Sequence, residues 1–210
     1  MTVRLILASK SPARTKLLAE AGIDHSILVS DVDEAAVVAS YGDLDAHDTS
    51  LLLARAKAEA VASLQVAEDA LVIGCDSVFE FDGEAHGKPY ESAVAIERIS
   101  RMRGRFGVLH TGHWLVDTRD GGSGATIGRV SSATVHFGAM SDAEVRDYVA
   151  SGEPLQCAGA FTIDGLGGAF IDRVDGDPHA VVGLSISTLR SLLHSAGVPI
   201  TALWDKSSSL

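Results

Sequence analysis

The sequence has few cysteines, little positive charge and no long hydrophobic run. Among its 210 residues, 17 are Lys or Arg and 28 are Asp or Glu, which gives a formal net charge of −11. This acidic balance argues against nonspecific binding to nucleic acid or to a membrane surface, because both need a positive field. The two cysteines, Cys75 and Cys157, cannot build a disulfide framework and indicate a reducing compartment.

No apolar stretch approaches the roughly 18 residues that a membrane-spanning helix needs, and the first apolar run covers only Leu5 to Ala8. We therefore expect no secretory signal, no membrane partner and a cytoplasmic location. The chain is 46% hydrophobic, so it can bury a sizeable core, and the collagen-like, coiled-coil and disordered classes are excluded. Without repeats or long linkers, residues 1–210 are predicted to form a single domain with a frayed tail at 206–210.

Patterns typical of helices alternate along the chain with patterns typical of strands. Apolar spacing and capping residues predict helices at 12–21, 50–66, 91–103, 142–151 and 184–196. Strands are predicted at 4–8, 23–29, 71–81, 107–117 and 125–137, with a polar loop at 40–50 and a Gly-rich β segment at 158–182. The Gly-rich connection at 118–124 predicts a hairpin and hence antiparallel pairing, so we expect an α/β protein with a mixed sheet.

The first candidate site lies where a predicted strand turns into a helix, at Ser9-Lys-Ser-Pro-Ala-Arg14. Free backbone N–H groups at a helix N-terminus favour an anion, and the hydroxyls of Ser9 and Ser11 together with Arg14 would complete a phosphate cradle. The alternative is an ordinary helix start, with Ser11 as N-cap, Pro in the first turn and a solvated Arg14.

A carboxylate and an amine fall on surfaces that the patterns predict to be buried. Asp76 lies within an apolar strand, where an ionised carboxylate is costly unless a metal, a cation or a hydrogen bond stabilises it. Lys57 has Leu53 and Val61 four residues to either side on the apolar face of a predicted helix. Its ammonium either meets a buried anion, such as Asp76 or a bound phosphate, or reaches past its neighbours into water. Asp76 could equally lie at a frayed strand end.

Further polar candidates are weaker individually. The paired carboxylates of Asp33 and Glu34 would suit Mg²⁺ or Mn²⁺, which select hard oxygen ligands, although acids in a loop are commonly just solvated. Lys88 lies in a Gly-Lys-Pro loop that says little alone. His110 and His113 are three residues apart in a predicted strand, so they point to opposite faces and do not easily share a metal.

Taken together, these motifs resemble the Maf family of nucleotide pyrophosphatases over almost the full chain. The resemblance is carried by LILASKSPAR (5–14), LARAKA (53–58), VIGCDS (72–77), GKP (87–89), SGEP (151–154), AGA (158–160), GLGGAF (165–170) and HAVVGL (179–184). It implies hydrolysis of a nucleoside triphosphate to its monophosphate and pyrophosphate, dependent on Mg²⁺ or Mn²⁺. It also implies a homodimer and a fold like that of inosine triphosphatases, an elongated mixed sheet flanked by helices, with two lobes and a central cleft.

The resemblance also implies roles for individual positions. Asp76 matches the family's catalytic aspartate, taken as general base for the attacking water and as a metal ligand. Lys57 and Lys88 match lysines of the site, and Glu34 matches a metal-associated acid. The positions predicted to bind the substrate are Ser9, Ser11, Arg14, Ser77 and Asp164. No covalent nucleophile is expected, because Cys75 points to the opposite face of the strand from Asp76.

The chain departs from the family pattern at positions that bear on function. Asp164 replaces a Gln typical of members that prefer thymidine or uridine triphosphates. A carboxylate only accepts hydrogen bonds, so if Asp164 faces the base, guanine or cytosine should be favoured over thymine. Ala13 stands where the family usually has an Arg, which removes one cation. A nucleotide-binding regulator of septum formation without turnover therefore stays an alternative, as does a metal-dependent phosphomonoesterase.

Overall fold

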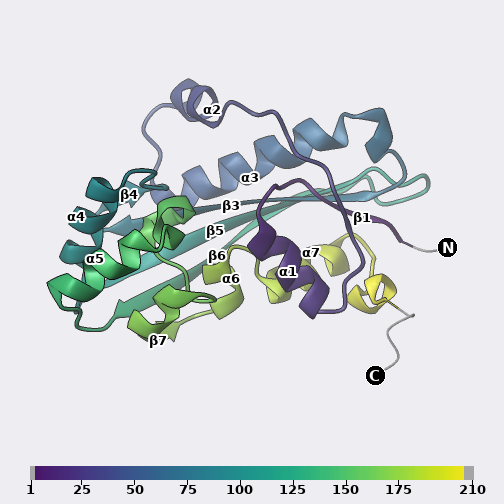
Figure 1. The fold of residues 1–210 in the computed structure, drawn as a ribbon. Coiled ribbons are helices and arrows are strands. Elements are labelled where there is room, and N and C mark those ends of the chain that lie inside the picture. The colour runs from purple at the N-terminus through teal and green to yellow at the C-terminus, as the bar shows by residue number, and fades with distance from the viewer. Residues whose placement is uncertain (1–2, 206–210) are drawn as a thin grey trace.

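The computed structural model describes residues 3–205, in which one mixed seven-stranded sheet runs the length of the molecule (Figure 1). Its strands are β1 (Leu5–Leu7), β2 (Ser26–Ile27), β3 (Leu71–Phe81), β4 (Glu84–His86), β5 (Phe106–Asp117), β6 (Thr126–Phe137) and β7 (Ile171–Asp175). The order is β2-β1-β3-β5-β6-β7, with β4 pairing β3. The β2-β1-β3 pairings are parallel and the others antiparallel, which confirms the predicted mixed α/β class. The tail predicted at 206–210 lies outside the described residues.

Helices cover both faces of this sheet. They are α1 (Pro12–Glu20), α2 (Glu34–Tyr41), α3 (Ala46–Ala62), α4 (Ser92–Met102), α5 (Asp142–Ala150), α6 (Pro178–Val182) and α7 (Ile186–Ser195). In Figure 1, α3 lies along one face, α1 and α7 lie together at one end, and α4 and α5 lie together at the other. Between residues 3 and 205, no helix combines the length and apolar character needed to cross a bilayer.

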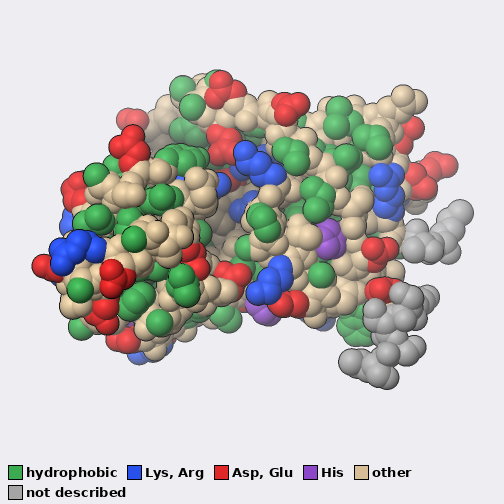
Figure 2. Space-filling model, viewed as in Figure 1, with side chains coloured by type: hydrophobic (Ala, Val, Ile, Leu, Met, Phe, Trp, Pro, Cys, Tyr) green, Lys and Arg blue, Asp and Glu red, His purple; other side chains and the backbone are tan. Residues whose placement is uncertain are grey.

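The three long strands connect hydrophobic cores at the two ends of the sheet. At one end, Leu71 and Ile73 of β3 pack with leucines of α1 and α7. Ten residues further along the chain from Leu71, the side chain of Phe81 packs in a second core with Phe137 and Phe161. Cores at both ends of one continuous sheet agree with the predicted elongated, two-lobed shape. Figure 2 shows a hollow between the two halves, with Lys or Arg side chains at its rim.

Helix α3 approaches the sheet closely because glycine lies beneath it at two places. A Cβ atom added to Gly74 would lie 2.3 Å from the carbonyl oxygen of Ala54, and one added to Gly112 would lie 2.2 Å from that of Ser50. Any larger residue would have to displace helix backbone rather than a flexible side chain. These glycines therefore set the height of α3 above β3 and β5.

The structure corrects two of the predicted segments. Residues 40–50 are not a loop, because α2 extends to Tyr41 and α3 begins at Ala46, where the Asp45 side chain accepts a hydrogen bond from the backbone N–H of Asp48. The first turn of α3 is polar, so the apolar spacing that predicts a helix is absent there. Residues 158–182 are not a long β segment either. They form 3₁₀ turns, the short strand β7 and α6, because glycines interrupt the chain repeatedly.

Other elements agree closely with prediction. The strand predicted at 71–81 has those bounds, and the two strands of the predicted hairpin differ by one residue each. The capping box at Ser141 is complete, since its hydroxyl accepts from the backbone N–H of Glu144 while the Glu144 carboxylate accepts from the N–H of Ser141. The strand predicted at 23–29 shrinks to the exposed edge strand β2.

Candidate active site

The candidate site lies at a gap in one edge of β3. Strand β1 pairs with β3 only as far as Ile73, whose carbonyl accepts from the N–H of Ala8, and β4 pairs with β3 only from Phe79 onward. Among the described strands, none pairs with residues 74–78 on that side, although β5 pairs with them on the other. Alternation along the strand directs Asp76 toward α3 and its two neighbours toward the opposite face.

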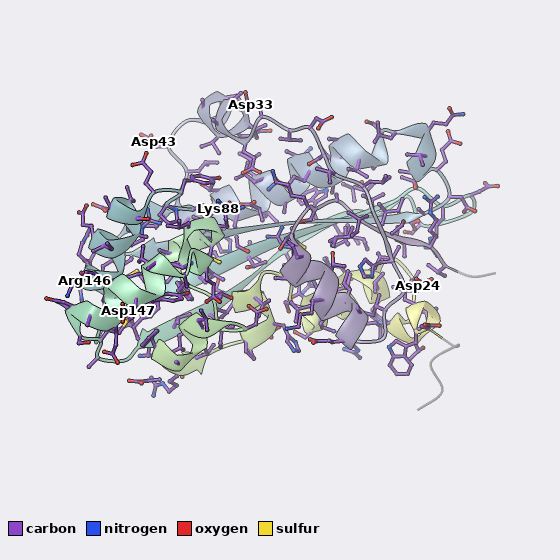
Figure 3. All side chains as sticks on the ribbon, viewed as in Figure 1. Asp24, Asp33, Asp43, Lys88, Arg146 and Asp147 are labelled. Carbon is purple, nitrogen blue, oxygen red and sulfur yellow. The ribbon has the colours of Figure 1, made fainter. Side chains whose placement is uncertain are left out.

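Lys57 on α3 contacts two carboxylates at this gap. Its Nζ lies 2.5 Å from Oδ1 of Asp76 and 2.8 Å from Oε1 of Glu34, the first residue of α2. The side chains of Lys57 and Asp76 are each only 13% exposed, whereas that of Glu34 is 53% exposed. The ammonium therefore meets a buried anion and does not extend freely into water. Figure 3 shows Asp33, which precedes Glu34, at the start of α2 above α3.

Burial raises the pKa of the Asp76 carboxyl above its usual value, while Lys57 and Arg14 oppose that rise. The folded state therefore binds a proton at Asp76 more tightly than the unfolded chain does. Ionising this group costs stability as the pH rises above the ordinary value of 3.8. A buried carboxylate kept beside two cations at a strand edge is typical of a functional group, because such an arrangement tunes its basicity.

Arg14 lies at the same unpaired edge of β3, on the face opposite Asp76, and is 9% exposed. Its Nη1 donates to the carbonyl of Cys75 at 2.8 Å and to Oγ of Ser9 at 3.0 Å. Its Nε donates to the carbonyl of Gly183 at 2.7 Å, and Nη2 donates to Oγ of Ser77 at 3.3 Å. The guanidinium thus binds the Cys75 carbonyl, which has no partner among the described strands on that edge of β3. It also connects α1, β3 and the end of α6.

The hydroxyl groups near Arg14 are held in fixed positions. Oγ of Ser9 accepts from the backbone N–H of Ser11 at 3.2 Å, and Ser11 is the N-cap residue of α1, as predicted. Oγ of Ser77 lies 2.8 Å from Oγ1 of Thr111, which donates to the carbonyl of Ala180. Sequence patterns did not single out Thr111, because a threonine in a strand is unremarkable there.

Cys75 takes no part in the polar cluster through its side chain. It packs in the hydrophobic core beneath α1 and α7, and burial raises the pKa of its thiol to about 12. At neutral pH the group is therefore a protonated thiol and a poor nucleophile. Its orientation away from Asp76 agrees with the alternation expected from the sequence.

Lys88 and Asp164 lie apart from this cluster, on the lobe that carries α4 and α5. Burial raises the pKa of the Cys157 thiol to about 11, with Glu153 and Asp164 adding to the rise and Lys88 opposing it, so these charges act on one thiol. Asp164 is exposed and accepts a hydrogen bond from Thr162 Oγ1. Figure 3 shows Lys88 at the edge of this lobe that faces the middle of the molecule.

The residues at the β3 gap also suit a hard divalent cation. The carboxylates of Asp76 and Glu34 converge on one ammonium, so the three side chains together carry net negative charge. Carboxylate oxygens are the donors that Mg²⁺ and Mn²⁺ prefer. Asp76 and Glu34 could therefore hold such an ion if Lys57 shifts its position.

Residues 4–196 match the family model described as Maf-like protein. The chain belongs to the Maf family. Its similar relatives include proteins named nucleoside triphosphate pyrophosphatase from Salinispora tropica, 55% identical and covering 100% of this chain and 91% of the relative, and from Leifsonia xyli subsp. xyli, 51% identical and covering 97% and 98%. A structure search finds the Ham1 protein of Staphylococcus aureus, 15% identical, with a TM-score of 0.40, covering 64% of this chain and 71% of that one.

The segments that carry the Maf resemblance gather into two groups in space. Segments 5–14, 53–58, 72–77 and 179–184 meet at the β3 gap through the contacts of Arg14 and Lys57. The other four segments meet on the opposite lobe, where the N–H of Gly159 donates to the carbonyl of Gly87 and the Glu153 carboxylate accepts from the N–H groups of Leu166 and Gly167. The Maf motifs therefore occupy both lobes.

Proposed function

We propose that this Maf-family protein hydrolyses nucleoside triphosphates to nucleoside monophosphates and pyrophosphate, with Asp76 as the general base. The observation that carries the proposal is the buried Asp76 carboxylate at the unpaired edge of β3, with its pKa raised by burial and its Oδ1 bound to Lys57. Relatives named nucleoside triphosphate pyrophosphatase, up to 55% identical over the full chain, support the same reaction class.

In the proposed reaction each residue acts through its position at the gap. The triphosphate lies between the N-terminus of α1 and Lys57, where N–H groups and the ammonium offset its charge. Asp76 accepts the proton of the attacking water through the oxygen that does not bind Lys57. Arg14 holds Ser9 and Ser77 in place rather than reaching freely into solvent. Lys88 meets the substrate from the opposite lobe.

Mg²⁺ or Mn²⁺ bound by Asp76 and Glu34 would neutralise phosphate charge and lower the pKa of a bound water. The Lys57 ammonium lies between these carboxylates, 2.5 Å from one and 2.8 Å from the other. Glu34 is the more exposed of the two and belongs to α2, so it is free to adjust when substrate binds.

The direct test is product analysis with purified protein, a panel of nucleoside triphosphates, and Mg²⁺ or Mn²⁺. We expect pyrophosphate and the monophosphate in equal amounts. Tight nucleotide binding without turnover would favour the alternative, a regulator of septum formation, and release of orthophosphate would favour a phosphomonoesterase. If Asp164 contacts the base, guanosine and cytidine substrates should turn over faster than thymidine triphosphate. A strong thymidine preference would exclude that role for Asp164.

The Lys57→Met variant should shift the acid limb of the pH profile of kcat/KM to higher pH. A general base must be ionised, so activity rises with pH through the pKa of Asp76, which lies above 3.8. Lys57 lowers that pKa, and its loss leaves the effect of burial less opposed. The Lys16→Met variant, changed at an exposed lysine of α1, should keep the wild-type limb. If the acid limb of Lys57→Met lies at the wild-type pH, Asp76 is not the base whose ionisation the profile reports.

A further inference from the structure

A second group of potential ligands lies at the N-terminal end of α3. One ligand atom from each of Asp45, His47 and Asp48 lies within 4.8 Å of the other two. The His47 ring also meets the ring of His110 on β5 edge-on, with 5.8 Å between their centroids. Glu80 on β3 adds a carboxylate whose Oε2 lies 3.5 Å from Nε2 of His110. A chain of close contacts therefore links two imidazoles and three carboxylates from three elements.

His110 supplies an observation independent of the acidic cluster. The residue is 9% exposed, and its Nδ1 lies 2.8 Å from Oγ of Ser132. Its Nε2 is buried and makes no well-formed hydrogen bond among residues 3–205, with the Glu80 carboxylate 3.5 Å away. Leaving a buried ring nitrogen without a partner is costly, so such an atom calls for a ligand. The second ring nitrogen of a metal-binding histidine is usually held by a carboxylate, a backbone carbonyl or water, and the Ser132 hydroxyl takes that place at His110.

We propose that His47 and His110, together with carboxylates of Glu80 and Asp45, bind a borderline-soft divalent ion of the zinc type. Imidazole nitrogens suit Zn²⁺ and its neighbours in the first transition row, whereas Mg²⁺ prefers oxygen ligands alone. Two nitrogens and two carboxylate oxygens would complete a four-coordinate zinc site. The site is thus chemically distinct from the oxygen ligands of Asp76 and Glu34.

The surroundings allow the ligand atoms to close around an ion. Ligand atoms in a tetrahedral zinc site lie about 3.3 Å apart. The His47 and Glu80 side chains are 49% and 39% exposed, so they rotate without disturbing the core, while His110 stays fixed. The N-terminal end of α3 carries positive partial charge, which disfavours a cation. The carboxylates of Asp45, Asp48 and Glu80 outweigh it.

The position of the site predicts what the ion would do. In the pairing of β3 with β5, His110 is opposite Val78, and Gly112 is opposite Asp76. The ion would therefore bind at His110, two residues along β5 from Gly112, the residue opposite Asp76. It would connect the start of α3 to the sheet. Because α3 also carries Lys57, the ion would hold the helix in place without touching the reacting groups. This inference does not depend on the proposed hydrolysis.

The test is calorimetric titration of the chelator-treated full chain with Zn²⁺, in the absence of nucleotide. We expect one ion per chain, and an affinity at least 10-fold lower in His47→Ala and in Glu80→Gln. Both residues lie at the surface, so these variants should fold, which circular dichroism checks. The matched control is His194→Ala, an exposed histidine in the last turn of α7, which should bind Zn²⁺ as the wild type does.

The Asp76→Asn variant separates this site from the one at the β3 gap. We expect it to keep wild-type Zn²⁺ affinity, and we expect bound Zn²⁺ to raise the melting temperature of the wild type but not of His47→Ala. Equal Zn²⁺ affinity in His47→Ala and the wild type would overturn the proposal. So would binding that Asp76→Asn abolishes and His47→Ala retains.

Discussion

The Asp76→Asn variant should release pyrophosphate about 10²- to 10⁴-fold more slowly than the wild type, the usual contribution of a general base. Asparagine has nearly the same shape as aspartate but cannot accept the proton of an attacking water. Lys57 keeps its contact with Glu34 in the variant, so the charge that holds α2 against α3 persists. The loss should therefore appear in kcat, while nucleotide affinity measured by calorimetry in the absence of divalent metal should change by only a few-fold.

The matched control is Asp43→Asn, which removes the same charge from an exposed residue between α2 and α3 (Figure 3). This variant should hydrolyse nucleotides at the wild-type rate. Initial rates of pyrophosphate release with Mg²⁺ and with Mn²⁺ provide the measurement. A near-normal rate in Asp76→Asn would mean that another group accepts the proton, and the proposed mechanism would have to be abandoned.

The Gly74→Ala variant should lose about 3 kcal/mol of its free energy of unfolding, at the upper end of the range for overpacked sites. The added methyl group would lie 2.3 Å from the carbonyl oxygen of Ala54 and 2.8 Å from the backbone nitrogen of Ala58. Neither atom belongs to a flexible side chain, so α3 must lift away from β3. Because α3 carries Lys57, the same movement should lengthen the contact with Asp76 and lower activity in the fraction that folds.

Urea unfolding, followed by circular dichroism, measures this loss as a lower midpoint at an unchanged slope. Gly87→Ala is the comparison, since a Cβ there meets nothing within 4 Å and its backbone is not in the left-handed region. That variant should unfold within about 1 kcal/mol of the wild type. Similar midpoints for Gly74→Ala and Gly87→Ala would show that α3 tolerates a wider separation from the sheet.

The long, strongly patterned elements could be predicted because their signals are local. Strand β3 carries a run of β-branched and aromatic residues, and α5 begins with the complete capping box at Ser141. The failures have local causes too. Polar residues fill the first turn of α3, and in α2 the only polar residues are at its ends, Glu34, Ser40 and Tyr41. Between 158 and 182, glycines favour turns over the strand that the apolar residues suggested.

The charged residues of the candidate site could also be predicted from their neighbours along the chain. Asp76 interrupts an apolar strand and Lys57 interrupts an apolar helix face. Each mismatch suggested a buried charge in need of a partner, with a frayed strand end and a lysine that reaches into water as the alternatives. The structure pairs the two with each other, 19 residues apart in sequence. The partners of Arg14 could not be read this way, because Cys75 and Gly183 are 61 and 169 residues away.

The sequence by itself determined the mixed α/β class, the acidic character, the Maf relationship and the residues whose burial requires a partner, because each depends on composition or on neighbours along the chain. Only the tertiary structure decided that β1 stops at Leu7 and leaves part of β3 unpaired, that Arg14 closes that edge, and that Lys88 and Asp164 belong to the other lobe. Strand pairing and helix packing join distant residues, and no local pattern encodes which carbonyl such pairing leaves free.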